Sequence, residues 1–145
     1  KQPEIMHKLP HGSIITPHPK EFERLFGKTV NSMLQAEQAR MQAMKYNINI
    51  VLKGHHTLIA NPEGECWYNV NGNAGMATGG SGDVLTGIIT GLLAQGYASN
   101  EAALLGVYLH GAAGDIAAAE YSQEAMVAGD IINNLGGAFK ALATN

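Results

Sequence analysis

Charged side chains and cysteine are both scarce in this 145-residue sequence. Charged residues make up 14% of it, whereas an average soluble domain has about 25%. The formal net charge of −3 excludes the basic surface of a nucleic-acid-binding domain, and the 46% hydrophobic content excludes an intrinsically disordered chain. No uninterrupted apolar run reaches the roughly 20 residues of a membrane span. We therefore expect neither a nucleic acid nor a membrane as a partner.

Cys66 is the only cysteine, so the sequence can form no internal disulfide and no cysteine-based zinc cage. A single cysteine is typical of a reducing compartment, and we expect a cytoplasmic protein. His55 and His56 look like a metal-binding pair, but adjacent residues on an extended strand point to opposite faces. No metal site is therefore predicted.

The shortage of charge is concentrated in one region. Between Val84 and Gly114 the only charged side chain is that of Glu101. Helices that are polar on neither face are usually buried on both. We expect the helices of this region to be covered by the rest of a larger domain or by an oligomer partner.

Periodicity and turn residues predict a chain that alternates strands and helices and then ends in helices. The expected strands cover residues 13–16, 48–53, 57–60 and 65–70, and the expected helices cover residues 20–26, 32–46, 83–95, 100–121 and 129–142. Ser32 with Gln35 forms a capping-box pattern, and Asn100 is suited to cap a helix. This order is typical of an α/β layer architecture, and it shows no internal domain boundary.

Glycine is abundant where charge is scarce. Eight of the 18 glycines lie between Gly72 and Gly96, and a glycine-rich loop over residues 71–82 leads straight into an apolar helix. Glycine lets an anion approach the backbone N–H groups, and the first turn of a helix adds unpaired N–H groups and a positive dipole. The combination predicts a phosphate site, with Asp83 at the helix start as a candidate general base.

The glycine-rich loop has two other possible explanations, and it does not match two well-known phosphate-binding motifs. Glycine-rich turns also occur without ligands, and the helix dipole alone favours an acidic residue such as Asp83. These two alternatives stay open. The loop lacks the Gly-Lys-Ser/Thr ending of a P-loop, and no strand leads directly into it as a dinucleotide-binding fingerprint requires.

The same loop resembles a motif of a known family. The run Gly80-Ser81-Gly82-Asp83 is similar to the glycine-any-glycine-aspartate anion hole of the ribokinase-like superfamily, and the longer run 75–87 resembles the ADP/ATP-dependent NAD(P)H-hydrate dehydratases. Three further segments are similar to that family in the same order: Thr16–Glu21, Val51–Gly54 with Thr57, and Tyr108–Gly111 with Gly114 and Asp115. Lys20 departs from the pattern, because glycine is common at that position.

The resemblance implies a ribokinase-like three-layer α/β/α fold. The family's catalytic domain is longer than this chain, so residues 1–145 would be the C-terminal half of one such domain. The missing N-terminal half would then be a partner of this chain. The resemblance also implies a homo-oligomer, and a tetramer would fit the family.

The implied reaction repairs hydrated NAD(P)H by phosphoryl transfer from ADP or ATP to its hydroxyl, followed by loss of phosphate. Asp83 would contact the hydrated cofactor and accept the hydroxyl proton. The N–H groups of Gly80, Ser81 and Gly82 would stabilise charge on the transferring phosphoryl group.

Further segments would hold the two small molecules. By the same resemblance, His18 would contact the hydrated cofactor. Gly82 would lie beside the phosphates, with Mg²⁺ held mainly by phosphates and water. The residues implied to contact the nucleotide are Lys53, Gly54, His55, His56 and Thr57. A turn residue without a partner is the alternative for His18, and a solvated strand-end residue is the alternative for Lys53.

Asp115 is a candidate supporting residue. If the helices over 83–95 and 100–121 are antiparallel, their rise of about 1.5 Å per residue returns Asp115 to the level of Asp83. Asp115 would then support the anion loop, whereas its alternative role is helix solubility.

Two other functions compete with the dehydratase. One is a kinase of the same superfamily that phosphorylates a sugar or a vitamin precursor, and the other is a nucleotide-binding fragment without turnover. The extended similarity over residues 75–87 favours the dehydratase.

Overall fold

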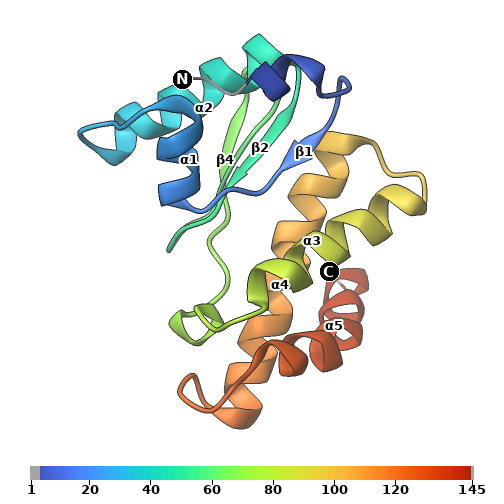
Figure 1. Ribbon diagram of the computed structural model, residues 1–145. Coiled ribbons are helices and arrows are strands. Elements are labelled where there is room, and N and C mark those ends of the chain that lie inside the picture. The colour runs from blue at the N-terminus through green and yellow to red at the C-terminus, as the bar shows by residue number, and fades with distance from the viewer. Residues whose placement is uncertain (1–3, 145) are drawn as a thin grey trace. The chain divides into compact units, whose positions relative to one another are not determined.

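The computed structural model describes residues 4–144, which divide into two units between Tyr68 and Asn69 (Figure 1). The first unit, which we call the sheet unit, contains every strand of the described residues. The second, which we call the helical unit, contains three long helices. Each expected strand and helix is present. The helix over residues 32–46 has the expected bounds, and no end of another element differs from its expected position by more than two residues. That both units belong to a single domain stays a prediction.

Four short strands form the sheet unit's centre. They lie side by side in the order β1 (Ile14–Ile15), β2 (Asn49–Leu52), β3 (Leu58–Ala60) and β4 (Cys66–Tyr68). β1 pairs with β2 in parallel, whereas β2, β3 and β4 form an antiparallel meander. All residues of β2 and β3 are buried, as expected of apolar and β-branched segments in the interior of a protein.

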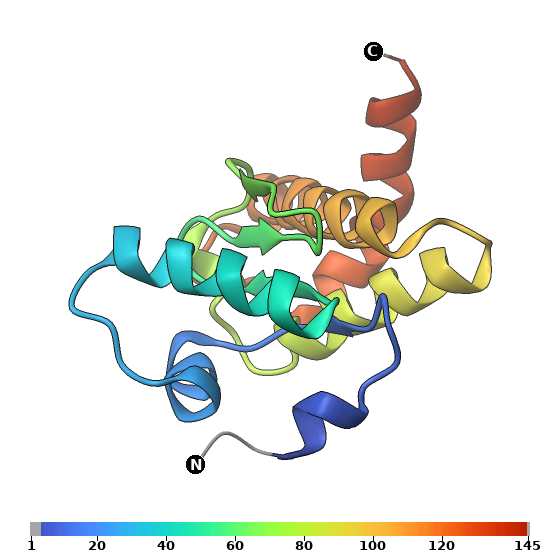
Figure 2. The ribbon, with the colours of Figure 1, turned by 90° about the horizontal axis from the view of Figure 1, so that it is seen from above.

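Helices α1 (Pro19–Phe26) and α2 (Ser32–Tyr46) lie on one side of this sheet (Figures 1 and 2), and the short 3₁₀ helix η1 (Glu4–Lys8) precedes them. Phe22 of α1 and Ile50 of β2 share one core cluster and have no exposed surface. Burial of each such side chain contributes about 1.5–3 kcal/mol. The cluster therefore attaches both helices to the strands.

The structure confirms the predicted end of α1 at Phe26 and corrects the predicted cap of α2. Gly27 ends α1 with φ 96°, a conformation that favours glycine. Asn31 caps α2, because its Oδ1 accepts the N–H of Leu34 at 2.9 Å. The expected capping box of Ser32 and Gln35 is therefore wrong, and Ser32 is the first residue inside the helix.

The helical unit consists of α3 (Ser81–Ala94), α4 (Ser99–Tyr121) and α5 (Ala128–Ala143), preceded by the 3₁₀ helix η2 (Ala74–Met76). α4 packs against both α3 and α5. α3 begins two residues earlier than expected, because Gly80 caps it. Asn100 does not cap α4, since the helix begins after Ala98, whose N–H donates to Glu101 Oε2 at 3.1 Å.

Helix α4 is long and apolar enough to cross a membrane by length and composition alone. It has 23 residues, and its most apolar 18-residue window has a mean hydropathy of 1.3. Half of that window is buried inside the structure, as in a core helix that packs between neighbours. Such a helix is weak evidence for a membrane span, and the absence of a membrane partner stays a prediction.

Candidate anion site and its supports

The glycine loop ends in a helix start that no side chain caps. Gly80 is the N-cap of α3, with φ 88° and ψ −14°, and it offers no capping side chain. The Gly80 carbonyl accepts the N–H of Val84 at 3.0 Å, so the helix is regular from its first turn. The N–H groups of that first turn have no intrahelical acceptor. They can therefore bind an anion.

Asp83 lies in this first turn and is exposed, as is Gly79. A Cβ placed on Gly79 would meet no heavy atom within 4 Å, so the backbone there is open to an incoming group. Ser81 N–H donates to the Thr78 carbonyl at 3.3 Å, a weak contact that a strong acceptor can replace. The end of the loop thus combines N–H groups that have no intrahelical acceptor with one exposed carboxylate.

A histidine that the sequence analysis did not assign to the site contacts the first residue of α3. His110, on α4, places its Nε2 atom 3.0 Å from the carbonyl oxygen of Ser81 and 3.2 Å from its Oγ. Ser81 is 6% exposed. No local pattern indicates this contact, because the two residues lie 29 positions apart.

Asparagines at every second position from 69 to 73 connect the beginning of the loop to α4: two of them bind α4 directly, and the third binds one of these two. Asn71 Nδ2 donates to the Tyr108 carbonyl at 3.0 Å, and Asn69 Nδ2 donates to Asn71 Oδ1 at 2.6 Å. Asn73 Nδ2 donates to the Gly114 carbonyl at 3.0 Å, while its Oδ1 accepts the N–H of Gly75. Gly72, between Asn71 and Asn73, has φ 98°, so the segment is not a regular strand, and no simple sequence pattern indicates these contacts.

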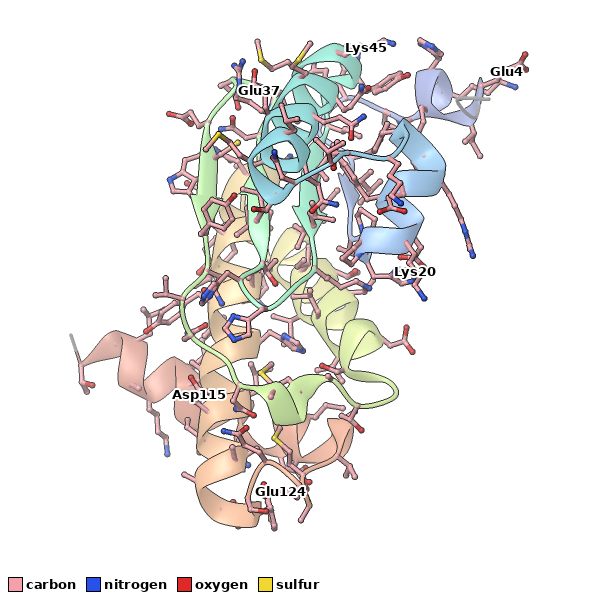
Figure 3. The ribbon with its side chains drawn as sticks, turned by 90° about the vertical axis from the view of Figure 1, so that its left-hand side faces the viewer. Glu4, Lys20, Glu37, Lys45, Asp115 and Glu124 are labelled. Carbon is pink, nitrogen blue, oxygen red and sulfur yellow. The ribbon has the colours of Figure 1, made fainter. Side chains whose placement is uncertain are left out.

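Asp115 contacts the glycine-rich loop, as expected of a supporting residue. Its Oδ2 accepts the N–H of Gly72 at 2.9 Å, and its Oδ1 accepts Asn73 Nδ2 at 3.0 Å. In Figure 3 Asp115 points from α4 toward this loop. The contact is with the start of the loop, so Asp115 acts at a distance from the N–H groups of the first turn of α3.

We expect the Asp115→Asn variant to loosen this attachment. An amide offers one acceptor oxygen where the carboxylate offers two, so one of the two hydrogen bonds is lost. The free energy of unfolding of the complete protein should fall by about 1–2 kcal/mol, measured by urea denaturation. Asp130→Asn is the matched control, because Asp130 Oδ2 accepts only the Val127 N–H and an amide oxygen can replace it. Equal stability of the two variants would contradict the role of Asp115.

Glycines on α4 allow the loop to lie close to the helix. A Cβ on Gly111 would overlap Asn71 Oδ1, and a Cβ on Gly114 would lie 2.7 Å from Met76 Cε. A Cβ on Gly75, within the loop, would lie 2.8 Å from the Cα of Gln123. The positions of these glycines therefore follow from tertiary contacts, which the helical pattern of α4 does not reveal.

In the sheet unit, His18 is the N-cap of α1. Its Nδ1 accepts the N–H of Glu21 at 3.2 Å, and its own N–H donates to Glu21 Oε2 at 2.7 Å. Its Nε2 lies 3.3 Å from Glu21 Oε1. The alternative of a turn residue without a partner is therefore wrong, although the side chain is 45% exposed.

The hydrogen bond from the His18 backbone holds the pKa of the Glu21 carboxyl below its ordinary value, and the charges of Lys53 and Arg24 act in the same direction. Because the pKa is lowered in the folded state, the stabilisation is present above the unfolded-state pKa. It is lost as the pH falls through the folded-state value. We expect the Glu21 carboxyl to titrate at lower pH in the folded protein than in urea, measured by NMR. Equal midpoints would contradict the cap.

The two segments implied to contact small molecules in the sheet unit lie together. Lys53 N–H donates to the Pro17 carbonyl at 2.9 Å, so residues 53–57 start beside the residue that precedes His18. Both segments follow the carboxyl ends of the parallel strands β1 and β2, where open α/β sheets bind ligands. Lys53 is half-buried, and Gly54, His55 and His56 are exposed.

His55 and His56 do not point to opposite faces, which corrects the expectation. Residues 54–56 form a bend between β2 and β3, and the two imidazole rings meet edge to face with centroids 4.4 Å apart. Within residues 4–144 no three His, Cys, Asp or Glu side chains are grouped to hold a metal ion.

An apolar groove of about 480 Å³ runs along α3 from Asp83 to Gln95. α5 forms its other wall, where Ile132 and Phe139 are 57% and 40% exposed. The remaining lining residues are Val84, Gly87, Ile88, Gly91, Leu92 and Leu135. The groove therefore leaves part of the charge-poor helix α3 uncovered, and Asp83 of the candidate anion site lies at one end of it.

Comparison with known proteins identifies relatives along nearly the whole chain. A family model described as NAD(P)H-hydrate dehydratase matches residues 1–136. The bifunctional NAD(P)H-hydrate repair enzyme of Moorella thermoacetica is 50% identical over 128 residues, which cover 86% of this chain and 24% of that protein.

Two solved structures are similar as well. The ADP/ATP-dependent NAD(P)H-hydrate dehydratase of Bacillus subtilis, co-crystallised with ATP/Mg²⁺, is 41% identical with a TM-score of 0.82, covering 90% of this chain and 48% of that one. A ribokinase-like superfamily protein of Enterococcus faecalis is 35% identical with a TM-score of 0.73, covering 88% and 44%. This chain thus spans less than half the length of each relative.

Proposed function

Because the chain belongs to the NAD(P)H-hydrate dehydratase family, with its ribokinase-like α/β fold, we propose that it forms the C-terminal half of an enzyme that dehydrates NAD(P)H hydrate with ADP or ATP. The observation that carries the proposal is the uncapped, glycine-led start of α3 with Asp83 in its first turn. A helix start of this kind stabilises negative charge, and phosphoryl transfer depends largely on such stabilisation.

In the proposed first step, the hydroxyl oxygen of the hydrate bonds to the terminal phosphorus of the nucleotide. The bond from that phosphorus to the nucleotide's bridging oxygen breaks, and Asp83 takes the hydroxyl proton. N–H groups of Gly80, Ser81 and Gly82 stabilise the charge on the phosphoryl oxygens. In the second step the carbon–oxygen bond breaks, phosphate leaves with the electron pair, and loss of a proton from the neighbouring ring carbon restores the double bond.

We assign the nucleotide to the segment from Lys53 to Thr57 together with Gly82, and the hydrated cofactor to His18 and Asp83. The position of the first segment after β2, beside the loop that holds His18, supports the pairing of the two ligands. Mg²⁺ would accompany the nucleotide and would be held mainly by its phosphates and by water.

We further propose that the part of the domain present in relatives but not in this chain covers the groove along α3. The exposed apolar side chains of Ile132 and Phe139 support this, since they would lose contact with water. We also propose that the complete protein is a cytoplasmic homo-oligomer, specifically a tetramer. Light scattering of the complete protein measures the oligomeric state.

The direct test is to supply hydrated NADH and ADP or ATP to the complete protein. Recovery of the near-ultraviolet absorbance of NADH, dependent on the nucleotide, is expected. Phosphorylation of a sugar or vitamin precursor without such recovery would favour a kinase instead. Nucleotide binding without any turnover would indicate a binding protein, and either result would overturn the dehydratase proposal.

A further inference from the structure

His110 contacts α3 at its first residue, Ser81. One nitrogen, Nε2, faces two oxygens of Ser81: the carbonyl oxygen at 3.0 Å and Oγ at 3.2 Å. A carbonyl oxygen can only accept a hydrogen bond. The shorter contact is therefore a hydrogen bond only if Nε2 carries the proton.

This assignment fixes the role of the serine hydroxyl. With the proton on Nε2, both oxygens of Ser81 are acceptors for it, in a shared hydrogen bond. The hydroxyl proton of Ser81 then points away from His110 and can be donated to another acceptor. Since Ser81 begins the helix, the donation adds to that of the N–H groups in the first turn.

Helix α4 also holds the other end of the loop. Asp115 binds Gly72 and Asn73, whereas His110 binds Ser81. The glycine-rich stretch between these two attachments therefore begins and ends on one rigid helix. A site that stabilises a transferring phosphoryl group requires its donors to be positioned in advance, and displacement by about 1 Å can cost up to about 100-fold in rate.

We propose that His110 is a positioning residue for the anion site, donating from Nε2 to Ser81 and thereby fixing the start of α3. The inference rests on the proposed function, because it assigns a phosphoryl group to that helix start. His110 itself does not act on the substrate. Its effect is transmitted through the position of Ser81 and of the adjacent N–H groups.

The test compares three replacements of His110 in the complete protein. In glutamine, the side-chain NH₂ lies at about the reach of the histidine Nε2, whereas the NH₂ of asparagine lies nearer the backbone, at about the reach of Nδ1. We expect His110→Gln to keep kcat within about threefold, while His110→Asn and His110→Ala lower kcat about 10- to 100-fold. The KM for hydrated NADH should change less than kcat. His11→Gln, at an exposed position, is the control for loss of a histidine.

A glutamine variant as poor as the alanine variant, or an asparagine variant as good as the glutamine one, would overturn the proposal. If His110 only stabilises the fold, the activity of all three variants should fall in proportion to their thermal stability, and this result would also overturn the proposal. The tautomer provides a readout that does not depend on activity: ¹⁵N NMR should show the proton of His110 on Nε2. A proton on Nδ1 would refute the proposal even in an active enzyme. Absence of turnover in the unmodified protein, with the proton on Nε2, would instead refute the proposed function.

Discussion

Replacement of Asp83 by Asn in the complete protein is expected to lower kcat for dehydration of NAD(P)H hydrate by about 100- to 10,000-fold. A positioned general base contributes a factor of this size, and an amide cannot accept the hydroxyl proton. The exposed position of Asp83 in the first turn of α3 means that the substitution should leave the stability of the protein almost unchanged. Nucleotide-dependent recovery of NADH absorbance measures the activity.

The matched control for this variant is Asp130→Asn. Asp130 is also an aspartate in the first turn of a helix, α5, where it accepts the N–H of Val127. We expect this control to retain normal kcat. If the Asp83→Asn variant is as active as the control, Asp83 is not the base. Its remaining role would be the favourable interaction of an acidic residue with the helix dipole.

Replacement of Gly75 by Ala is expected to have the largest effect on stability. The added Cβ would lie 2.8 Å from the Cα of Gln123 and 2.7 Å from Met126 Sδ, in the connection between α4 and α5. The Gln123 atom belongs to the backbone, so a side-chain rotation cannot relieve the clash. We expect the free energy of unfolding to fall by about 1–3 kcal/mol, together with a loss of activity as the loop moves away from the helices.

Gly136→Ala is the control, with an effect of opposite sign. Gly136 lies inside α5, and a Cβ there would meet no heavy atom within 4 Å. Alanine in a helix interior is more stable than glycine by about 0.5–1 kcal/mol. Urea denaturation of both variants measures the difference. Similar stability for the two would show that the loop does not pack on the Gln123 backbone.

The greater length of the relatives offers an explanation for the low number of charged residues in α3 and α4. Because this chain spans less than half of each relative's length, we expect the remaining part of the domain to bury the groove along α3, in which Asp83 is the one charged lining residue. The segments that we assign to the two ligands follow the carboxyl ends of β1 and β2. The activity therefore has to be measured on the complete protein.

The sequence by itself determined the types of element and the location of the glycine-rich loop before α3. These depend on local properties: β-branched runs such as Ile48 to Leu52 favour strands, Gly27 ends a helix, and a glycine run before an apolar segment leaves N–H groups open. The resemblance over residues 75–87, together with the three further segments that follow the same order, also identified the family. None of these inferences required knowledge of which residues contact one another in the folded chain.

Only the tertiary structure decided how the loop is held. His110 lies 29 residues from Ser81, and Asp115 lies 43 residues from Gly72. A glycine on α4 has the same local pattern whether or not a loop crosses it, so the close approach at Gly111 was not predictable. Local periodicity describes neighbours along one element, whereas these contacts depend on which elements pack together.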